Sequence, residues 1–497
     1  YFCLCLYFYK LIYLFYFYYF KAFITKTMHL GKKTKIVCTI GPATETVEKL
    51  TNLVNAGMDV MRLNFSHGDF TEHQTRVDNL RKVMKETGRS LAIMQDLGGP
   101  KIRIGEFEGG VTVLKEGQTF TLTTEKIMGD NSRVHINYPL LPKEVKVGGI
   151  IMLHDGKKKL EITKIKGNEV ITKVIVGGEI KNRRGVNLPG AYLSISSITE
   201  KDRADLQFGI KNKLDFIALS FVRRAKDIIE LREILDKAKS KAKIIAKIET
   251  PEALENIDEI LKLTDAIMVA RGDLAIEIPA EDVPLAQKML IHKCNALGKP
   301  VITATQMLES MIKSPVPTRA EVSDVANAII DGTDAIMLSE ETTLGDFPVE
   351  AVSMMTRIAL RVEKDVYTSD TISKFDPAHG TTDIISQAAV RTAHKVGAKF
   401  IVAVTDSGRT ARMIARYRPS ERIIAISSNG ASPTLALSFG CYPVIVPKYK
   451  TIDEVMTAVR SLAIKNKLAK KGDVVVLAAG VPLGKLKETN TILVETI

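Results

Sequence analysis

Tryptophan is absent from this chain of 497 residues, and cysteine is scarce, with five residues. Cys3 and Cys5 lie near the start, and the other three stand alone in apolar surroundings: Cys38, Cys294 and Cys441. The lack of CxxC spacing and of an even count argues against a disulfide framework or a cysteine-rich metal site. We expect the three isolated cysteines to be small core residues in a reducing compartment, which indicates the cytoplasm.

Two kinds of binding motif are also missing. No Walker loop and no GxGxxG segment occurs, so the sequence does not support a P-loop or Rossmann nucleotide site. The net charge is +13, but Lys and Arg are spread along the chain, without a long basic run or an aromatic-interleaved RNA motif. We therefore expect no nucleic-acid partner, since anionic small molecules account for the same excess of positive charge.

The first 27 residues differ from the rest. They hold 13 of the 30 aromatic residues, and the first methionine is Met28. The apolar run Leu11–Phe20 resembles a short transmembrane or signal segment, but it lacks a cleavage site and is unusually rich in tyrosine for a lipid-facing helix. Its residue types share A/T-rich codons. We favour upstream sequence translated in error over a membrane anchor, and we expect no membrane association.

From Thr34 onward, short apolar runs recur with helical segments between them. Eight runs are expected to be strands: Thr34–Gly41, Met58–Phe65, Ser90–Leu97, Asp215–Val222, Lys243–Glu249, Ala266–Asp273, Pro300–Gln306 and Ala335–Thr342. This alternation is typical of parallel pairing, and eight such units can close into a TIM (β/α)8 barrel. Helix starts support it, because Thr250-Pro251 provides a cap followed by proline, and Thr318 and Glu321 form a capping box.

The gap between the third and fourth runs breaks this rhythm. From Pro100 to about Gly190, alternating β segments such as Thr119–Thr123 and Glu169–Val176 predict a small β domain that covers the barrel as a lid. After a long helix, about Pro348–Asp365, a separate α/β unit follows, with strands expected at Phe400–Thr405, Arg422–Ser427 and Asp473–Ala478. The predicted division is an atypical tail (1–27), a barrel (28–99 and 186–365), a lid (100–185) and a C-terminal domain (366–497).

Charged side chains end two of the apolar runs. Lys247 and Glu249 end one run, and Asp273 ends the next. Such charges cost free energy at the end of a buried strand unless they are paired or bound to a metal. Two carboxylates suit Mg²⁺, and strand alternation places Lys247 and Glu249 on the same side. An ammonium beside a metal indicates phosphoryl transfer.

Polar residues also stand at the carboxyl ends of the other runs, where barrel enzymes place their chemistry. Read in order, the strand ends carry Arg62, Asn64, Asp96, Ser220, Lys247, Glu249, Arg271, Asp273, Thr305, Ser339, Glu340 and Glu341. Any one of these taken alone could be a satisfied polar group. Together with Arg103, they provide cations, a carboxylate pair and hydroxyls, which predicts a phosphate-and-metal site.

Several segments together resemble the pyruvate kinase family. They are MRLNFSHG (61–68), KIIAKIETPEAL (243–254), MVARGDLAIEIP (268–279), ITATQMLESM (302–311) and PTRAEVSDVANAI (317–329), and the resemblance spans about Lys32 to Ile497. It implies a barrel, a small β-barrel lid inserted after the third strand and a C-terminal α/β regulatory domain, usually in a homotetramer. It also implies transfer of a phosphoryl group from phosphoenolpyruvate to ADP, giving pyruvate and ATP in the last step of glycolysis.

The resemblance implies roles for particular residues. Glu249 and Asp273 would hold Mg²⁺ or Mn²⁺, and Lys247 would bridge the moving phosphoryl group. Substrate contacts would come from Arg62, Ser220, Lys247, Ala270, Arg271, Gly272, Asp273 and Thr305. Thr305 would border the face where enolpyruvate is protonated, with Ser339 and Glu341 nearby. The nucleotide contacts would be Asn64, His67, Arg103, Arg184 and Asp155.

The sequence leaves the commoner family pattern at one place. Many members need K⁺, held at positions that match Asn64, Ser66, Asp96 and the carbonyl of Leu97. In them Thr-Lys-Gly-Pro-Glu follows the aspartate, whereas Leu-Gly-Gly-Pro-Lys follows it here, so that Lys101 replaces the glutamate. A fixed ammonium would supply the charge of the monovalent cation, as in K⁺-independent members. We expect activity without K⁺; the alternative is a solvated surface lysine.

A second ligand loop is expected in the C-terminal domain, between a strand and a helix. Its residues are Thr405, Ser407, Gly408, Arg409 and Thr410. Hydroxyls and amides at a helix start form an anion pocket, and in the family this loop binds a phosphorylated allosteric effector. The absence of tryptophan excludes an effector loop that stacks an indole. An ordinary capped turn is the alternative interpretation.

Two rival functions remain at this point. Another phosphoenolpyruvate-using barrel enzyme that phosphorylates a protein histidine would need a phosphohistidine segment, and no histidine here lies in such a motif. A catalytically silent binding protein could share the fold. Against it, the residues expected to act on substrate are all intact: Arg62, Lys247, Glu249, Asp273 and Thr305.

Overall fold

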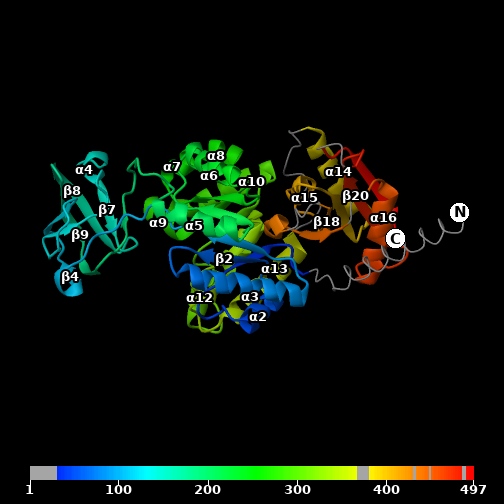
Figure 1. Cartoon of the computed structure of the whole chain (residues 1–497), viewed down its shortest axis with the longest axis horizontal. Coiled ribbons are helices and arrows are strands. Elements are labelled where there is room, and N and C mark those ends of the chain that lie inside the picture. The colour runs from blue at the N-terminus through cyan, green and yellow to red at the C-terminus, as the bar shows by residue number, and fades with distance from the viewer. Residues whose placement is uncertain (1–30, 367–379, 429–432, 447–448, 484–487) are drawn as a thin grey trace, which may run out of the picture.

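The computed structural model describes residues 31–366, 380–428, 433–446, 449–483 and 488–497. The interpretations of residues 1–27, and of the stretch between the long helix and Thr381, lie outside these ranges. Among the described residues, no helix is both long and apolar enough to cross a membrane. The barrel lies between the lid and the C-terminal domain (Figure 1).

The eight predicted parallel strands close into a barrel, in the order β1, β16, β15, β14, β13, β12, β3, β2. Their bounds are β1 Lys35–Thr39, β2 Val60–Asn64, β3 Ala92–Asp96, β12 Phe216–Leu219, β13 Lys243–Ile248, β14 Ala266–Ala270, β15 Val301–Ala304 and β16 Ala335–Leu338. Apolar side chains such as Val37, Met94 and Ile245 fill the barrel interior. The expected runs were longer than the strands, because their polar last residues belong to loops or short helices.

Helices cover the outside of the barrel. They are α2 Val47–Ala56, α3 Phe70–Thr87, α5 Glu200–Lys211, α6 Ala225–Lys237, α7 Pro251–Glu255, α8 Ile257–Leu263, α9 Arg271–Glu277, α10 Val283–Leu297, α11 Arg319–Asp331, α12 Glu340–Thr343 and α13 Pro348–Val366. The two predicted caps are confirmed: the Thr250 side chain accepts from the amide of Ala253, and Thr318 and Glu321 form a reciprocal capping box.

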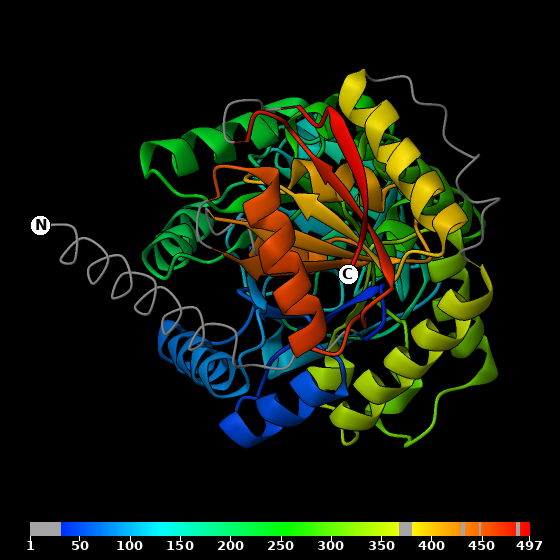
Figure 2. The same cartoon turned by 90° about the vertical axis from the view of Figure 1, so that its right-hand side faces the viewer.

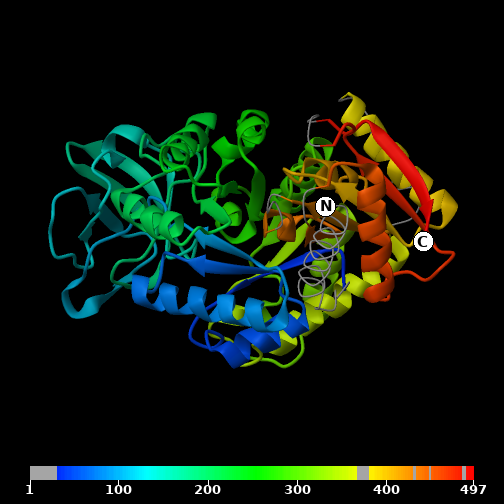
Figure 3. The same ribbon diagram turned by 45° about the vertical axis from the view of Figure 1, so that its right-hand side comes forward.

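The inserted lid is built from β strands, as predicted. Its elements are β4 Val111–Leu114, β5 Thr119–Thr123, β6 Arg133–His135, α4 Leu141–Glu144, β7 Ile150–Leu153, β8 Lys158–Lys166, β9 Glu169–Val176, β10 Gly178–Lys181 and β11 Val186–Asn187. A six-stranded sheet (β11-β7-β8-β9-β5-β6) and a two-stranded sheet (β10-β4) share one core, which is a two-sheet form of the expected small β-barrel. Because β11 pairs with β7, the lid sheet reaches Asn187, past the expected boundary at 185. Figure 3 shows the lid standing over one end of the barrel.

The C-terminal domain is a five-stranded sheet with helices against it (Figure 2). Its elements are α14 Thr381–Val396, β17 Phe400–Val404, α15 Arg409–Ala415, β18 Arg422–Ser427, β19 Cys441–Ile445, α16 Ile452–Lys465, β20 Val474–Ala479 and β21 Thr491–Thr496, with the strand order β19-β18-β17-β20-β21. The sequence analysis missed β19 and β21, which are the two edge strands and are only partly buried. Cys38, Cys294 and Cys441 are free and buried, which confirms their expected place in the core.

Candidate active site

Lys247 lies at the centre of the polar side chains at the carboxyl end of the barrel. Its Nζ donates to Ser220 Oγ at 2.7 Å and lies 2.9 Å from Glu249 Oε1 and 3.2 Å from Asp96 Oδ1. Burial by itself lowers the pKa of this ammonium, but the charges of Asp96 and Glu249 outweigh it and raise the pKa above its ordinary value. Lys247 is therefore a fixed positive charge at neutral pH, and its contact with Glu249, the residue after β13, places the two side chains on the same side of the chain, as predicted.

Asp96 connects Lys247 to a second cation, Arg62. Its Oδ2 accepts from Arg62 Nε at 2.7 Å, and Arg62 Nη1 donates to Thr39 Oγ1 at 2.8 Å. Burial raises the pKa of Asp96, yet the charges of Lys247 and Arg62 bring it below its ordinary value. Asp96 stays ionised and holds the two cations beside each other. The sequence analysis placed Asp96 among the strand-end polar residues and assigned it to the remnant of a monovalent-cation site, but it missed this contact.

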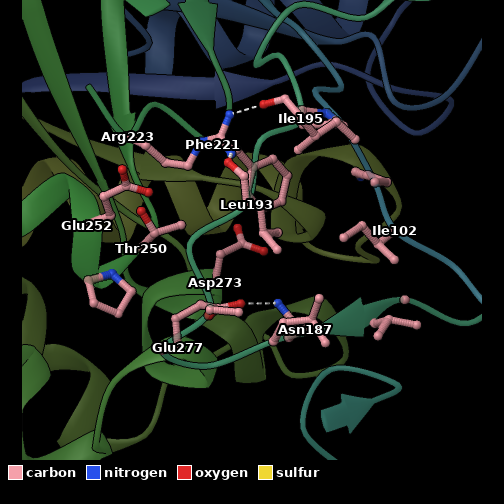
Figure 4. Close-up of a pocket in the computed structure, with 18 of the residues that line it drawn as sticks. Ile102, Asn187, Leu193, Ile195, Phe221, Arg223, Thr250, Glu252, Asp273 and Glu277 are labelled. Carbon is pink, nitrogen blue, oxygen red and sulfur yellow. Dashed lines mark hydrogen bonds between the residues drawn. The ribbon is translucent and has the colours of Figure 1, made fainter. Parts of the chain in front are cut away.

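Glu249 and Asp273 are the predicted carboxylate pair. Glu249 Oε2 accepts from the amide of Phe221 at 2.7 Å. Burial raises the pKa of Glu249, and Asp273 adds to this effect while Lys247 opposes it. Asp273 lines the cavity in Figure 4, and its carboxylate has no hydrogen-bond or ion-pair partner among the described residues. Glu249 shares the charge of Lys247, whereas Asp273 has no paired counter-charge among the residues that the structure describes, so together the two carboxylates fit a divalent cation such as Mg²⁺ or Mn²⁺.

This pair would be a sparse metal site. The described part of the chain contains no group of three or more His, Cys, Asp or Glu side chains arranged to hold a metal. A magnesium ion held by one or two carboxylates takes its other ligands from water and substrate oxygens. The donor set therefore suits a metal that binds together with an anionic substrate.

The sequence analysis predicted that Asp273 ends a strand, and this prediction was wrong. β14 stops at Ala270 and α9 begins at Arg271, so Asp273 lies in the first turn of a helix, where the helix dipole favours a carboxylate. Arg271 points toward Asp324, with Nη1 2.7 Å from Oδ1.

The loop after β15 has a strained backbone. Thr305 and Gln306 have positive φ angles of 69° and 53°, a conformation that costs about 1–3 kcal/mol for each such residue. The amide of Gly272 donates to Thr305 Oγ1 at 2.7 Å, and Arg271 Nη2 donates to the Thr305 carbonyl at 2.7 Å. These bonds hold Thr305 against the first turn of α9, beside Asp273. Arg271 thus connects the start of α9 to the loop after β15.

Glu341 is buried near this loop, but its carboxylate is already engaged. Its oxygens accept from the amides of Leu308 at 3.2 Å and of Ser339 at 2.7 Å, and burial raises its pKa. The expected strand is shorter here as well, since β16 ends at Leu338 and α12 begins at Glu340. Glu341 therefore joins the loops after β15 and β16.

A cavity of about 330 Å³ lies between the lid and the barrel (Figure 4). Its wall contains predicted site residues from both: Lys101, Arg103, Asp155, Arg184 and Asp273. Within the described structure, Arg184 Nε is buried without a hydrogen-bond partner, and a cationic donor of this kind suits an anion. Asn64 and His67 are not in this wall; they belong to the end of β2 and the loop that follows it.

Lys101 lies at the mouth of the cavity, with its side chain exposed to solvent. The surrounding protein and the positive charges of Lys247 and Arg103 lower the pKa of its ammonium, while Asp273 and Asp96 act in the opposite direction. Lys101 is therefore within electrostatic reach of the central cluster, and its role in place of K⁺ stays a prediction.

The loop after β2 is held by two residues that the sequence analysis missed. Lys201 Nζ donates to the carbonyl of Phe65 at 2.7 Å, and His73 Nε2 bonds to the carbonyl of His67 at 3.0 Å. The His73 ring stacks on Phe65, and burial lowers its pKa to about 4, so it is a neutral donor. Burial and the cations at the cavity mouth also lower the pKa of His67. A lone histidine in the apolar stripe of α3 was the available sequence signal.

The predicted effector loop connects β17 to α15. Thr410 does not face an open pocket, because it is buried and its hydroxyl bonds to that of Thr489 at 2.8 Å. Arg412 donates to the carbonyl of Ser407 at 3.4 Å and so closes one side of the loop. Exposed polar groups remain at Ser407 and Arg409. Effector binding by this loop stays a prediction.

The closed (β/α)8 barrel, with fixed cations and two carboxylates beneath a lid, defines the class of barrel enzymes that act on anionic substrates. Comparisons with known proteins identify the family. The family model for the pyruvate kinase barrel domain matches residues 31–352, and the model for the pyruvate kinase alpha/beta domain matches residues 383–495. The chain belongs to the pyruvate kinase family.

Similar proteins agree over almost the whole chain. A pyruvate kinase of Geobacillus stearothermophilus is 50% identical over 474 residues, which cover 94% of this chain and 81% of that protein. A pyruvate kinase of Clostridium perfringens is 44% identical over 473 residues, covering 94% of this chain and 100% of the other. The crystal structure of a Cryptosporidium parvum pyruvate kinase superposes with a TM-score of 0.90 at 40% identity, covering 94% of this chain and 96% of that one. The predicted fold class and kinase activity are thereby confirmed.

Proposed function

We propose that the cluster around Lys247 transfers the phosphoryl group of phosphoenolpyruvate to ADP. The supporting observation is the Lys247 ammonium held between Asp96 and Glu249, where their charges raise its pKa and keep it protonated at neutral pH. As phosphorus leaves the enol oxygen, negative charge is shared among oxygens that Lys247 neutralises without reorganisation. A divalent cation at Glu249 and Asp273 would supply Lewis-acid polarisation of the substrate oxygens.

The remaining residues of the barrel would position the substrate. Arg62 and Ser220 would hold the phosphate, since Arg62 donates to Asp96 beside Lys247 and Ser220 accepts from Lys247 itself. Thr305 and the first turn of α9 would hold the carboxylate. Thr305 would also border the carbon that accepts a proton from water, with Ser339 in the neighbouring loop. Glu341 would act indirectly, by holding that loop.

The nucleotide would enter from the lid side. Arg103 and Arg184 line the cavity and offer cationic donors to its phosphates, and Asp155 lies on the same wall. Asn64 and His67 would contribute from the loop after β2. The lowered pKa of His67 keeps its ring neutral at pH 7, so it would contact phosphate as a hydrogen-bond donor.

We extend the proposal to properties that the residues support less directly. Mg²⁺ or Mn²⁺ is the expected metal, and Lys101 supports activity without K⁺. A homotetramer, a cytoplasmic location and a phosphorylated effector at residues 405–410 follow from the family resemblance. The scarcity of cysteine agrees with a reducing compartment.

Replacement of Lys247 by methionine tests the central role. We expect kcat to fall by more than about 10³-fold, because the developing charge loses its fixed neutralising group. The assay couples pyruvate to lactate formation in the presence of phosphoenolpyruvate, ADP and Mg²⁺.

Lys243→Met is the matched control, since Lys243 lies on the same strand and pairs with Asp265 away from the site. Circular dichroism verifies that both variants fold. Normal turnover by Lys247→Met would show that the roles are assigned wrongly. A wild-type chain without activity in this assay would contradict the proposed reaction itself.

A further inference from the structure

The turn after β12, Ser220–Arg223, contacts both chain crossings between the barrel and the lid. The first crossing, residues 97–102, enters the lid, and the second, residues 188–197, returns from it. Ser220 Oγ donates to the carbonyl of Leu97 at 2.7 Å. A Cβ on Gly99 would come within 2.9 Å of Ser220 Cβ, so the first crossing packs directly on the turn.

Arg223 binds the second crossing through its side chain. Its Nη1 donates to the carbonyl of Leu193 at 2.6 Å, and its Nη2 donates to the carbonyl of Ile195 and, at 3.3 Å, to Ser197 Oγ. Ser197 Oγ in turn donates to the carbonyl of Phe221 at 2.9 Å. Figure 4 shows Arg223 and Phe221 beside Leu193 and Ile195. The guanidinium is buried, so these bonds are shielded from water.

The same turn contacts the two central residues of the active site. Phe221 donates its amide to Glu249 Oε2 at 2.7 Å, and Ser220 Oγ accepts from Lys247 at 2.7 Å. Phe221 has a positive φ of 53°, which is strained for a bulky residue. Such a conformation persists only where surrounding contacts enforce it, and Arg223 and Ser197 make those contacts.

We propose that Arg223 is a positioning residue that couples the lid to Glu249 and Lys247. It holds the return crossing of the lid against the turn whose amide orients the Glu249 carboxylate. Displacement of that crossing releases the strained φ of Phe221 and turns its amide away from Glu249. Arg223 acts through Phe221 and contacts no reacting atom. This inference rests on the proposed roles of Glu249 and Lys247.

The chemistry of the contact explains why arginine is needed. A planar guanidinium presents several N–H groups in a fixed fork and spans two carbonyls two residues apart. A lysine ammonium at this position reaches one carbonyl at a time. Arg223→Lys should therefore preserve the charge and the fold but only part of the coupling, whereas Arg223→Met should lose both contacts.

Hydrogen exchange and metal binding on the full chain test the coupling without turnover. In Arg223→Met we expect amide exchange in residues 193–197 and at Phe221 to accelerate by about 10-fold or more, because charged hydrogen bonds are lost. Mn²⁺ binding, followed by electron paramagnetic resonance with the metal alone, should weaken on the order of 5-fold. In the coupled assay kcat should fall by roughly 10-fold. Arg223→Lys should give intermediate values.

The adjacent residue supplies the control. Arg224 pairs with Glu252, and its bonds reach neither lid crossing, so Arg224→Met should leave exchange, Mn²⁺ binding and kcat unchanged. If Arg223→Met does not fold, Ser197→Ala replaces it, since this change removes the bond to the Phe221 carbonyl and should show the same three effects at smaller size.

Unchanged exchange in residues 193–197 would overturn the contact, and faster exchange with wild-type Mn²⁺ binding and kcat would overturn the coupling. If the wild-type chain did not convert phosphoenolpyruvate, the proposed function would fail, while exchange and Mn²⁺ binding would still decide on Arg223.

Discussion

At the scale of single residues, Lys101 places an ammonium on the wall of the lid cavity, and we predict that it supplies the positive charge that K⁺ would otherwise bring. Lys101 interacts electrostatically with Lys247, Asp96 and Asp273. A tethered charge is present in every molecule at any salt concentration, whereas a free monovalent cation must bind. We therefore expect this one residue to set the ion requirement of the enzyme.

We predict that KCl does not stimulate the wild-type enzyme in tetramethylammonium buffer. Lys101→Glu should lose activity in that buffer and recover on the order of 10-fold with KCl, because a carboxylate there restores the need for a cation. Steady-state kinetics with and without KCl measure both effects. Lys115→Glu, the same change on an exposed lid strand end, is the control. Strong K⁺ stimulation of the wild type would contradict the prediction.

At the scale of elements, the loop between β2 and α3 depends on a neutral histidine. His73 stacks on Phe65, with ring centroids 4.1 Å apart, and bonds to the carbonyl of His67. Burial lowers its pKa to about 4, so His73 is neutral throughout the physiological pH range, and the tautomer with its proton on Nε2 donates to this carbonyl. The helix thereby sets the position of a loop that we propose to contact nucleotide.

His73→Phe should keep the ring stack and remove the hydrogen bond. We expect KM for ADP to rise roughly 10-fold, with a smaller change in kcat and in KM for phosphoenolpyruvate, since a misplaced loop weakens nucleotide binding first. His73→Gln retains a side-chain donor and should recover part of the affinity. Equal changes in both KM values would show that the histidine has only a general structural role.

A buried aspartate beside two paired barrel strands makes the stability of the barrel depend on pH. Asp215 precedes β12, and its Oδ2 accepts from the amide of Ile93 at 2.8 Å. Burial raises its pKa to about 6. Because the folded state then binds the proton more tightly than the unfolded state, this contribution to stability is present at low pH and is lost as pH rises through about 4 to 6.

Asp215→Asn removes this dependence while keeping an oxygen acceptor for Ile93. Relative to the wild type, we expect the variant to gain on the order of 2 kcal/mol in free energy of unfolding between pH 4.5 and pH 7. Urea denaturation at several pH values measures the difference. Asp236→Asn on the surface of α6 is the control. Parallel pH profiles of wild type and Asp215→Asn would refute the assignment.

At the scale of the whole molecule, one buried ion pair joins the C-terminal domain to the barrel. Arg418 Nη2 lies 2.9 Å from Asp334 Oδ2, and its Nη1 donates to Oδ1 at 3.1 Å. Asp334 also accepts from the amides of Val301 and Phe439, one from each domain. Both domains therefore donate hydrogen bonds to the carboxylate of Asp334, the residue before β16.

Without the positive charge of Arg418, the C-terminal domain and the barrel should unfold in separate steps. We expect Arg418→Met to cost about 3–5 kcal/mol, because it leaves the charge of Asp334 buried and unpaired, and to split one calorimetric transition into two. Arg361→Met, which removes an exposed pair with Asp365, should cost about 0–1 kcal/mol. A single unshifted transition in Arg418→Met would show that other contacts hold the domains together.

The sequence by itself determined the elements and their order. Apolar periodicity, caps such as Thr250 and Thr318, and turn residues act within a few positions of the chain, so they can be read without coordinates. The same local rule placed Lys247, in β13, and Glu249, just after its end, on one side of the chain. Apolar periodicity did not reveal edge strands such as β19, because a half-exposed strand has a weaker apolar pattern.

Only the tertiary structure decided which charges meet. Asp96, at the end of β3, bonds to Arg62 of β2 and to Lys247 of β13. Asp273 lies in the first turn of a helix, and Arg223 binds the chain segment that returns from the lid. These contacts join residues far apart in the chain, and their distances depend on how loops pack after the strands end. Periodicity places a side chain on a face, but the packing of neighbouring elements sets its partner and hence its pKa.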